Sequence, residues 1–156
     1  MEMRVFLAIG LGVLASGCSE PGADIVLDSE AAEAAVGEVV SIGGSGAVTG
    51  KKGGRALIRA IVWDELVTSI DVTEGAPGDI VEDEVDTTFS AHSLEVPFDS
   101  SKTVDVTIGA EVVCAEAGTT EFQFLYDLFD ADDELFDSGS ASMVIDLTCV
   151  ASDSGS

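Results

Sequence analysis

The side chains with the widest chemical repertoire in this chain are three cysteines and a single histidine, His92. The cysteines are Cys18, Cys114 and Cys149, and no two of them form the Cys-x-x-Cys pair that is common at redox and zinc sites. A zinc or haem site would need further ligands that this set does not supply. The cysteines are therefore not predicted to bind a metal or to act as a redox pair.

A glycine-rich stretch, IGGSGA at residues 42–47, places Ser45 in a setting similar to the Gly-x-Ser-x-Gly nucleophile elbow. Ala47 stands where the last glycine of that motif belongs, and the elbow also needs a strand-to-helix turn, a histidine and an acid. His92 is the one candidate base, and it shares its parity with three apolar residues of the segment SAHSLEVPF. A half-buried or surface strand histidine is favoured over a hydrolase built on Ser45 and His92.

The same region continues into GSGAVTGKKGGR, at residues 44–55, which lacks the spacing of a phosphate-binding loop. A flexible basic hairpin loop is the favoured interpretation. Four of the five basic residues that follow Cys18 gather here or just beyond, namely Lys51, Lys52, Arg55 and Arg59. This basic patch is predicted either to dock an acidic partner or anionic glycan, or to pair with carboxylates of the same chain.

Two acidic runs could supply the oxygen ligands that calcium prefers. One comprises Glu82, Asp83, Glu84 and Asp86, and the other comprises Asp130, Asp132, Asp133 and Glu134. The second run lacks the glycine and the distant glutamate of an EF-hand loop. Solvated charge is the favoured interpretation, and a calcium-dependent adhesion module is the alternative function, with the second run as its site.

The net charge of the chain limits the classes of partner that the protein can bind. The 156 residues carry 30 Asp and Glu against 6 Lys and Arg, a net charge of -24. Nucleic acid is excluded as a partner because phosphate binding needs clustered basic residues, and the body is not expected to lie flat on anionic lipid. Such acidity resembles that of proteins from saline habitats, where salt screens the repulsion between carboxylates.

The first residues, MEMRVFLAIGLGVLASGCSE, combine Arg4 with an apolar run at residues 5–15 and small residues before Cys18. The run is too short to span a bilayer comfortably and is typical of a secretory signal. The segment ending in Cys18 resembles the lipobox of bacterial lipoproteins, with Ala15 at the usual leucine position. A cleaved signal with a chance cysteine is the alternative.

The resemblance implies a signal peptide over residues 1–17, cleaved before Cys18, and a diacylglyceryl group on the Cys18 sulfur. The new amino terminus of such proteins is often acylated as well, for example with palmitate. Two or more chains hold a protein stably, since each buried CH₂ contributes roughly 0.8 kcal/mol. In the enteric sorting rule, Ser19 after the cysteine indicates the outer membrane over the inner membrane.

Residues 18–36 are predicted to be a lipidated cysteine and an acidic tether. Within this tether DIVLD could form an edge strand and EAAEAAV a helical turn or two. Residues 151–156 are predicted to be a disordered tail.

Residues 37–150, between the tether and the tail, are predicted to form strands. Apolar residues alternate over Thr103–Cys114 and Glu121–Phe129, and again over Ala141–Cys149. Four further candidates have less regular patterns: Val36–Thr49, bulged or bent at GGSG; Arg55–Trp63, a central strand or a short helix; Val67–Val72; and Phe89–Phe98.

Cys114 and Cys149 form an even pair once Cys18 is lipidated, and an exported protein favours a disulfide. Both lie on the apolar faces of their strands. They come at the ends of the first and third strands of a meander, which run in the same direction and so end at the same end of the domain. The sequence therefore predicts a Cys114–Cys149 bridge between non-neighbouring strands.

Several strands joined by turns rich in Gly, Asp and Ser predict an all-β chain, a single antiparallel sandwich over residues 37–150. This layout resembles immunoglobulin-like and fibronectin-like domains of secreted bacterial proteins. The predicted function is a non-catalytic lipoprotein of the cell envelope, anchored in the membrane, that presents the sandwich to an envelope protein or glycan. No cofactor is predicted, apart from calcium in the alternative.

Overall fold

The computed structural model describes residues 20–62, 66–82, 90–99 and 101–151. In these ranges the chain forms strands and no helix, so no helix there could cross a membrane. The strands are β1 (Gly22–Leu27), β2 (Ala31–Ala35), β3 (Val39–Thr49), β4 (Arg55–Val62), β5 (Val67–Ala76), β6 (Asp79–Glu82), β7 (His92–Pro97), β8 (Thr103–Cys114), β9 (Gly118–Phe129), β10 (Leu135–Ser140) and β11 (Ile145–Val150).

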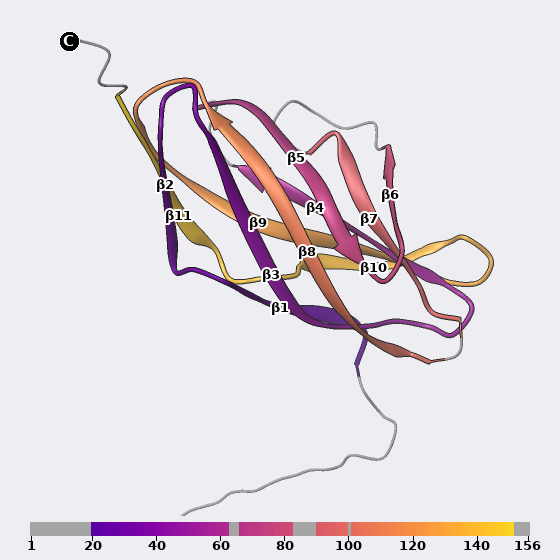
Figure 1. Ribbon diagram of the computed structural model, residues 1–156. Helices are drawn as coiled ribbons and strands as arrows, with labels where there is room; N and C mark the ends of the chain where they lie inside the picture. The colour runs from indigo at the N-terminus through magenta and orange to yellow at the C-terminus, as the bar shows by residue number, and fades with distance from the viewer. Residues whose placement is uncertain (1–19, 63–65, 83–89, 100, 152–156) are drawn as a thin grey trace, which may run out of the picture.

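The strands form two sheets that pack face to face (Figure 1). The smaller sheet has the order β1-β3-β8-β5. The larger has the order β2-β11-β9-β4-β7-β6, with β10 paired to β9 beyond the stretch that β11 covers. The predicted all-β sandwich is confirmed, with one refinement: β2 and β11 pair in parallel, whereas the other strand pairs are antiparallel.

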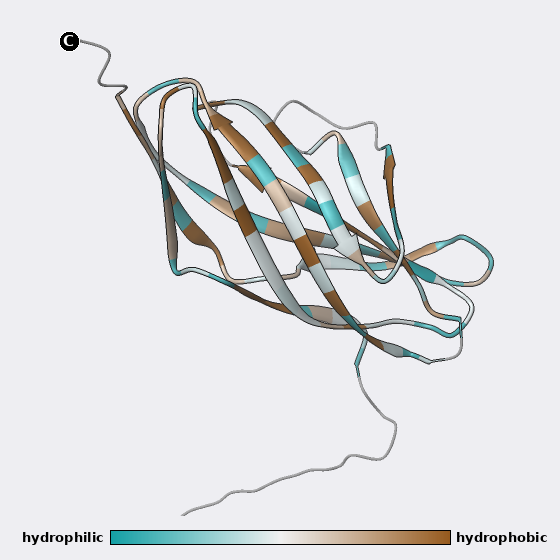
Figure 2. Cartoon of the chain, in the orientation of Figure 1, coloured by the Kyte–Doolittle hydropathy of each residue, from teal (hydrophilic) through white to brown (hydrophobic). Residues whose placement is uncertain are grey.

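Alternation of apolar and polar residues builds the core between the sheets. On β8, the even-numbered positions from Val106 to Cys114 are buried, whereas Asp105, Thr107 and Glu111 are exposed. Phe122 and Phe124 of β9 are fully buried in edge-to-face contact, with ring centroids 5.2 Å apart. Figure 2 shows this alternation as bands of contrasting hydropathy along β3 and β8.

Strand β4 lies in the middle of the larger sheet, between β9 and β7. Its core-facing residues Ala56, Ile58 and Val62 are fully buried, while Arg55 and Arg59 lie on the outer face. The prediction of a central strand here, over a short helix, is confirmed; Trp63 lies outside the described residues.

The tether predicted over residues 18–36 is corrected by the structure. The edge strand expected at DIVLD is present as β1, where Ile25 is buried and the chain pairs with β3. The helical turn expected at EAAEAAV is wrong, because these residues form β2 along β11. Pairing and the burial of Ala34 override the helix propensity of alanine.

Three smaller expectations also differ from the structure. β3 pairs with β8 without a register shift through GGSG, so this strand has no bulge there; the shifts are on β5. The alternation over Ala141–Cys149 predicts that Met143 lies on the apolar face, but Met143 is 80% exposed, because β11 begins only at Ile145. The short strands β6 and β10 carry no strong alternation and were not predicted.

Candidate functional site: a trough on the smaller sheet

Small side chains cover the outer face of the smaller sheet along its two central strands. Gly43 of β3 lies directly opposite Gly109 of β8. The next outward-facing pair is Ser45 with Thr107, and the pair after that is Ala47 with Asp105. Because glycine has no Cβ, the two glycines in register leave space above both strands, and the side chains of Asp28 and Glu74 occupy it, so that Gly109 is buried. This row of small residues forms the floor of a shallow trough.

Carboxylate side chains flank the glycine pair. A Cβ on Gly43 would lie 2.7 Å from Asp28 Oδ2, and one on Gly109 would lie 2.9 Å from Glu74 Cγ. The two glycines thus provide the space in which Asp28, just after β1, and Glu74, on β5, lie beside the floor. Both acidic residues are exposed, so their charge faces solvent along the trough.

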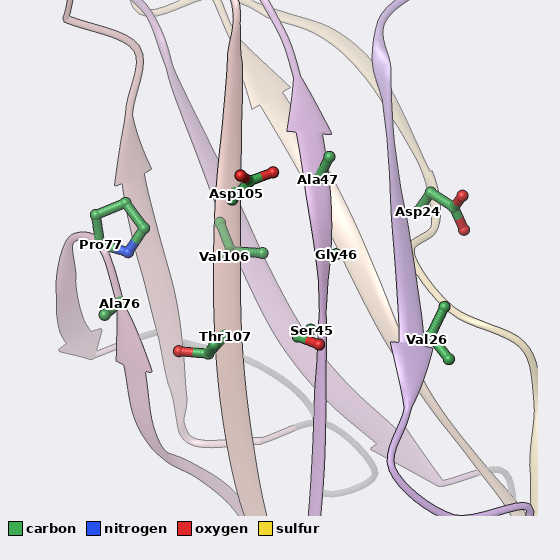
Figure 3. A pocket seen from close by; sticks show the side chains of 10 residues that line it. All are labelled: Asp24, Val26, Ser45, Gly46, Ala47, Ala76, Pro77, Asp105, Val106 and Thr107. Atoms are coloured by element: carbon green, nitrogen blue, oxygen red, sulfur yellow. The ribbon is translucent and has the colours of Figure 1, made fainter.

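At one end the trough widens into a hollow of about 720 Å³. Figure 3 shows that four segments line it: β1, β3, β8 and the turn at the end of β5. Its residues are Asp24, Val26, Ser45, Gly46, Ala47, Ala76, Pro77, Asp105, Val106 and Thr107. Val26 is 69% exposed, which gives the rim an apolar side chain available for contact.

The electrostatic character of the trough is acidic. Its lining, including the part that continues past the glycine pair, carries five carboxylates: Asp24, Asp28, Glu74, Asp105 and Glu111. Among the described residues that line it there is no lysine, arginine or histidine. The trough therefore suits a ligand with positive charge and an extended, slender shape.

Ser45 and His92 are not brought together. Ser45 lies on β3 of the smaller sheet, between Val26 and Thr107. His92 lies on β7 of the larger sheet, where its Nδ1 is 2.9 Å from Oδ1 of Asp71 on β5. The Asp71 carboxylate also accepts a hydrogen bond from the His92 backbone N–H at 2.9 Å. His92 is the half-buried strand histidine that was predicted, and here it links the two sheets.

The four basic residues of the predicted patch fall into two groups in the structure, the arginines and the lysines. Arg55 forms ion pairs with Glu95 and Asp133, and its guanidinium lies 4.3 Å from the Phe129 ring centroid. Arg59 pairs with Asp127, with an N–O distance of 2.7 Å. The two arginines therefore follow the alternative in which they pair with the chain's own carboxylates.

The two lysines of the patch lie in the β3–β4 connection, and both are exposed. Lys51 Nζ lies 4.2 Å from the centroid of the Phe136 ring. The patch is thus two internally paired arginines on β4 and two lysines at one end of the sandwich.

The acidic turn between β9 and β10 holds its carboxylates in local contacts. Asp130 Oδ1 accepts hydrogen bonds from the backbone N–H groups of Asp132 and Glu134, and Asp133 pairs with Arg55. Among the described residues, no group of three His, Cys, Asp or Glu side chains is arranged to hold a metal. Asp83, Glu84 and Asp86 of the other acidic run lie outside the described residues.

The predicted disulfide is confirmed. Cys114 at the end of β8 and Cys149 near the end of β11 are bonded, with their Cα atoms 5.7 Å apart. The bridge joins the smaller sheet to the larger one at the upper left of Figure 1, where β8 and β11 both end. Cys18, the predicted lipidation site, lies outside the described residues.

A hydrogen bond between Tyr126 and Asp137 contributes to a raised pKa of the Tyr126 hydroxyl. Its hydroxyl donates a hydrogen bond to Asp137 Oδ2 of β10, at 3.2 Å. Burial raises the pKa of Tyr126 above the ordinary value of 10.0, and the negative charge and hydrogen bond of Asp137 raise it further. This contact holds β10 against β9.

Sequence reasoning missed the trough, although two signals for it were present. The glycines of GGSG resemble parts of catalytic and phosphate-binding motifs, whereas in the structure they form part of a regular strand. Gly109 interrupts the outward polar face of Thr103–Cys114. Small residues at outward positions of two strands would have marked a bare sheet face, but only the pairing register places Gly43 opposite Gly109.

Comparison with known proteins finds similar structures, but no matching family and no matching sequence. No protein-family model matches the chain, and no curated protein matches its sequence. Among solved structures, it is similar to a non-cellulosomal cohesin from the archaeon Archaeoglobus fulgidus, with 10% identity, a TM-score of 0.47, and coverage of 83% of this chain and 92% of that one.

Two bacterial cohesins give similar values. CaCohA2 from Clostridium acetobutylicum has 11% identity, a TM-score of 0.46 and coverage of 83% and 92%. A type II cohesin domain from the cellulosome of Acetivibrio cellulolyticus has 14% identity, a TM-score of 0.41 and coverage of 80% and 95%. At this level the likeness concerns the general arrangement of strands, and what these proteins bind is not transferred to this chain.

Proposed function

We propose that the protein is a non-catalytic lipoprotein of the bacterial cell envelope whose sandwich binds a basic, extended segment of a partner protein in the trough. The observation that carries this proposal is the juxtaposition of a floor of small residues with acidic walls. The anchor is the lipid expected on Cys18, and the binding surface is the outer face of β3 and β8.

A polypeptide segment fits the trough better than a compact ligand. Ser45 and Ala47 are small enough to allow a backbone to approach the sheet closely beside the glycine pair, which Asp28 and Glu74 cover. The exposed hydroxyls of Ser45 and Thr107 can exchange hydrogen bonds with peptide groups, and Val26 and Pro77 offer apolar contact at the rim. Lysine or arginine side chains of the partner would reach Asp28 and Glu74 on the walls.

The charge of the trough also separates the candidate partners. A neutral glycan has no cationic group for five carboxylates to recognise, and an anionic glycan would be repelled. A basic protein segment gains attraction at both encounter and binding, since complementary potentials speed association. The proposal therefore commits to a protein partner.

The direct test is a titration followed by nuclear magnetic resonance. The isotopically labelled soluble domain, residues 20–151, would be titrated with a peptide of alternating lysine and threonine. Amide shifts are expected to change along β3 and β8 near Ser45 and Thr107. The same peptide with glutamate in place of lysine should leave the spectrum unchanged. Shifts spread evenly over the whole acidic surface would contradict a specific trough.

A matched pair of variants separates the trough from general acidity. D28K/E74K reverses the two carboxylates beside the glycine pair and should weaken binding of the lysine peptide at least tenfold. E121K/D146K makes the same change in net charge on the outer face of the larger sheet, where these two residues are paired in register. The second variant should retain most of the affinity. Equal losses in both variants would refute the trough as the site.

The anchor is tested separately, by mass spectrometry of the mature protein from a bacterial membrane fraction. The expected amino terminus is an acylated Cys18, and C18A should release the protein or leave its precursor uncleaved. An unmodified amino terminus at Ser19 or later would remove the anchor from the proposal and leave the trough in place.

A further inference from the structure

We infer that the sandwich stands end-on at the membrane, with Lys51, Lys52 and Lys102 among the phospholipid headgroups. This inference rests on the lipid anchor of the proposed function and goes beyond it by assigning the face that meets the bilayer. It draws on the length of chain between the anchor and the first strand, and on the location of the lysines.

The chain between Cys18 and the folded body is short. β1 begins at Gly22, so four Cα-to-Cα steps separate the proposed anchor from the sheet. Four extended steps span at most about 15 Å. β1 is held in place because it pairs with β3 along its whole length and because the Ile25 N–H donates to the Ala141 carbonyl at 2.6 Å. The body therefore cannot move far from a lipid attached at Cys18.

The strand register identifies the end of the sandwich that this short connection reaches. Gly22 pairs with Thr49 of β3, and Thr49 pairs with Thr103 of β8. The Gly50 N–H donates to the Lys102 carbonyl at 2.8 Å. Lys51 and Lys52 follow directly in the β3–β4 connection. The start of β1 and all three lysines of the chain thus lie at the same end of the smaller sheet.

The lysines are placed differently from the arginines. Lys51, Lys52 and Lys102 are exposed, while Arg55 and Arg59 are occupied by carboxylates of the body. A cationic side chain close to a phospholipid surface that contains anionic lipid is attracted to it. Three such side chains beside the anchor can orient a body that lipid already holds at the surface.

The large negative charge of the protein does not prevent this orientation. At physiological ionic strength the field of the membrane falls off within about 8 Å, so charges on the distant part of the body contribute little. β8 extends from Thr103 to Cys114, roughly 37 Å, which places the disulfide end far from the bilayer.

Some acidic residues do share the lysine end. On the smaller sheet they are Glu20, Asp24 and Asp105, close to the start of β1 and of β8, and on the larger sheet they are Asp79, Asp99 and the acidic turn with Asp130, Asp132, Asp133 and Glu134. The turn joins β9 to β10 in the larger sheet, and Asp133 pairs with Arg55, which also pairs with Glu95. The chain enters through the smaller sheet, on the side of Gly22, Thr49 and Lys102. The short connection therefore brings the lysines close to the headgroups and leaves the trough open on the flank.

The test uses the chain from residue 18 onward, coupled through the Cys18 thiol to a maleimide lipid in vesicles. Cys114 and Cys149 are joined in a disulfide, so Cys18 is the thiol available for coupling. A variant carrying E116K provides a reporter in the β8–β9 turn, at the far end. Acylation by an amine reagent is followed by mass spectrometry. The three native lysines should react several-fold more slowly than in free protein, and the reporter should react at an unchanged rate.

Two comparisons complete the test. Slowing should be greater on phosphatidylcholine vesicles that contain phosphatidylglycerol than on phosphatidylcholine alone, and a flexible insertion of about twenty residues before Glu20 should reduce it. Equal reactivity of native and reporter lysines would overturn the end-on orientation, and equal slowing on both vesicles would overturn the headgroup contact. Because coupling supplies the anchor, a native Cys18 without lipid would remove the anchor from the proposed function without altering this result.

Discussion

Gly46 of β3 lies so close to the Asp24 backbone of β1 that no larger residue fits between them. A Cβ on Gly46 would stand 2.8 Å from the Asp24 carbonyl carbon and closer still to its oxygen. The glycine is therefore what allows β1 to pair with β3 at this distance and to form one wall of the trough.

Alanine is expected to affect stability very differently at two glycines of the smaller sheet, Gly46 and Gly109. G46A should destabilise the fold by roughly 1–3 kcal/mol or more, because the backbone of β1 must move. G109A should change stability by less than about 1 kcal/mol, because its Cβ meets the Glu74 side chain, which can rotate away, and alanine suits a strand better than glycine. Urea unfolding of the two variants measures the difference. Similar losses in both would contradict the close approach at Asp24.

The Cys114–Cys149 bridge is expected to contribute a large share of the stability. It closes a loop with a sequence separation of 35, which in the chain-entropy model corresponds to about 4 kcal/mol. C114A/C149A should lose up to this amount in chemical unfolding, measured without reductant. As a control, reductant should destabilise the native protein and leave the double variant unaffected.

Ionisation of Tyr126 is expected to destabilise the protein at high pH. Burial and Asp137 raise the pKa of Tyr126 in the folded state above 10.0, so the unfolded chain loses this proton first. The stabilisation is fully present below pH 10 and is lost as pH rises through the folded-state pKa. The chain has one tyrosine, so absorbance at 295 nm follows this group alone.

D137N is the matched variant for this titration. It should lower the Tyr126 pKa and leave it above 10.0, because burial is the larger cause and remains. A titration of the native protein centred at or below pH 10 would show that the hydroxyl is more solvated than the contact with Asp137 implies.

Salt is expected to stabilise the sandwich. The chain carries a net charge of -24, and screening reduces repulsion among exposed carboxylates. The melting temperature should rise between low salt and about 1 M NaCl, as followed by circular dichroism. A flat or falling curve would mean that these charges are paired or well spaced, and the resemblance to proteins from saline habitats would lose its support.

The sequence by itself determined which residues face the core and which strands carry the disulfide. Period-two alternation over Thr103–Cys114 gave the strand with its bounds and its buried face, because a half-buried strand leaves a strong local pattern. The parity of Cys114 and Cys149 predicted their bridge, which is confirmed. The meander assumed for it is wrong, because β8 and β9 lie in different sheets and β10 intervenes between β9 and β11, although β8 and β11 still end beside each other at the bridge.

Only the tertiary structure decided the places where pairing outweighs local preference. EAAEAAV became a strand because β11 offers it an edge, and GGSG became a regular strand because β8 pairs with every residue of it. The trough depends on Gly43 meeting Gly109 across strands far apart in sequence. The common end of Gly22 and the three lysines depends on the register of β1, β3 and β8. Such register is a property of contacts between distant segments, which local patterns along one chain do not encode.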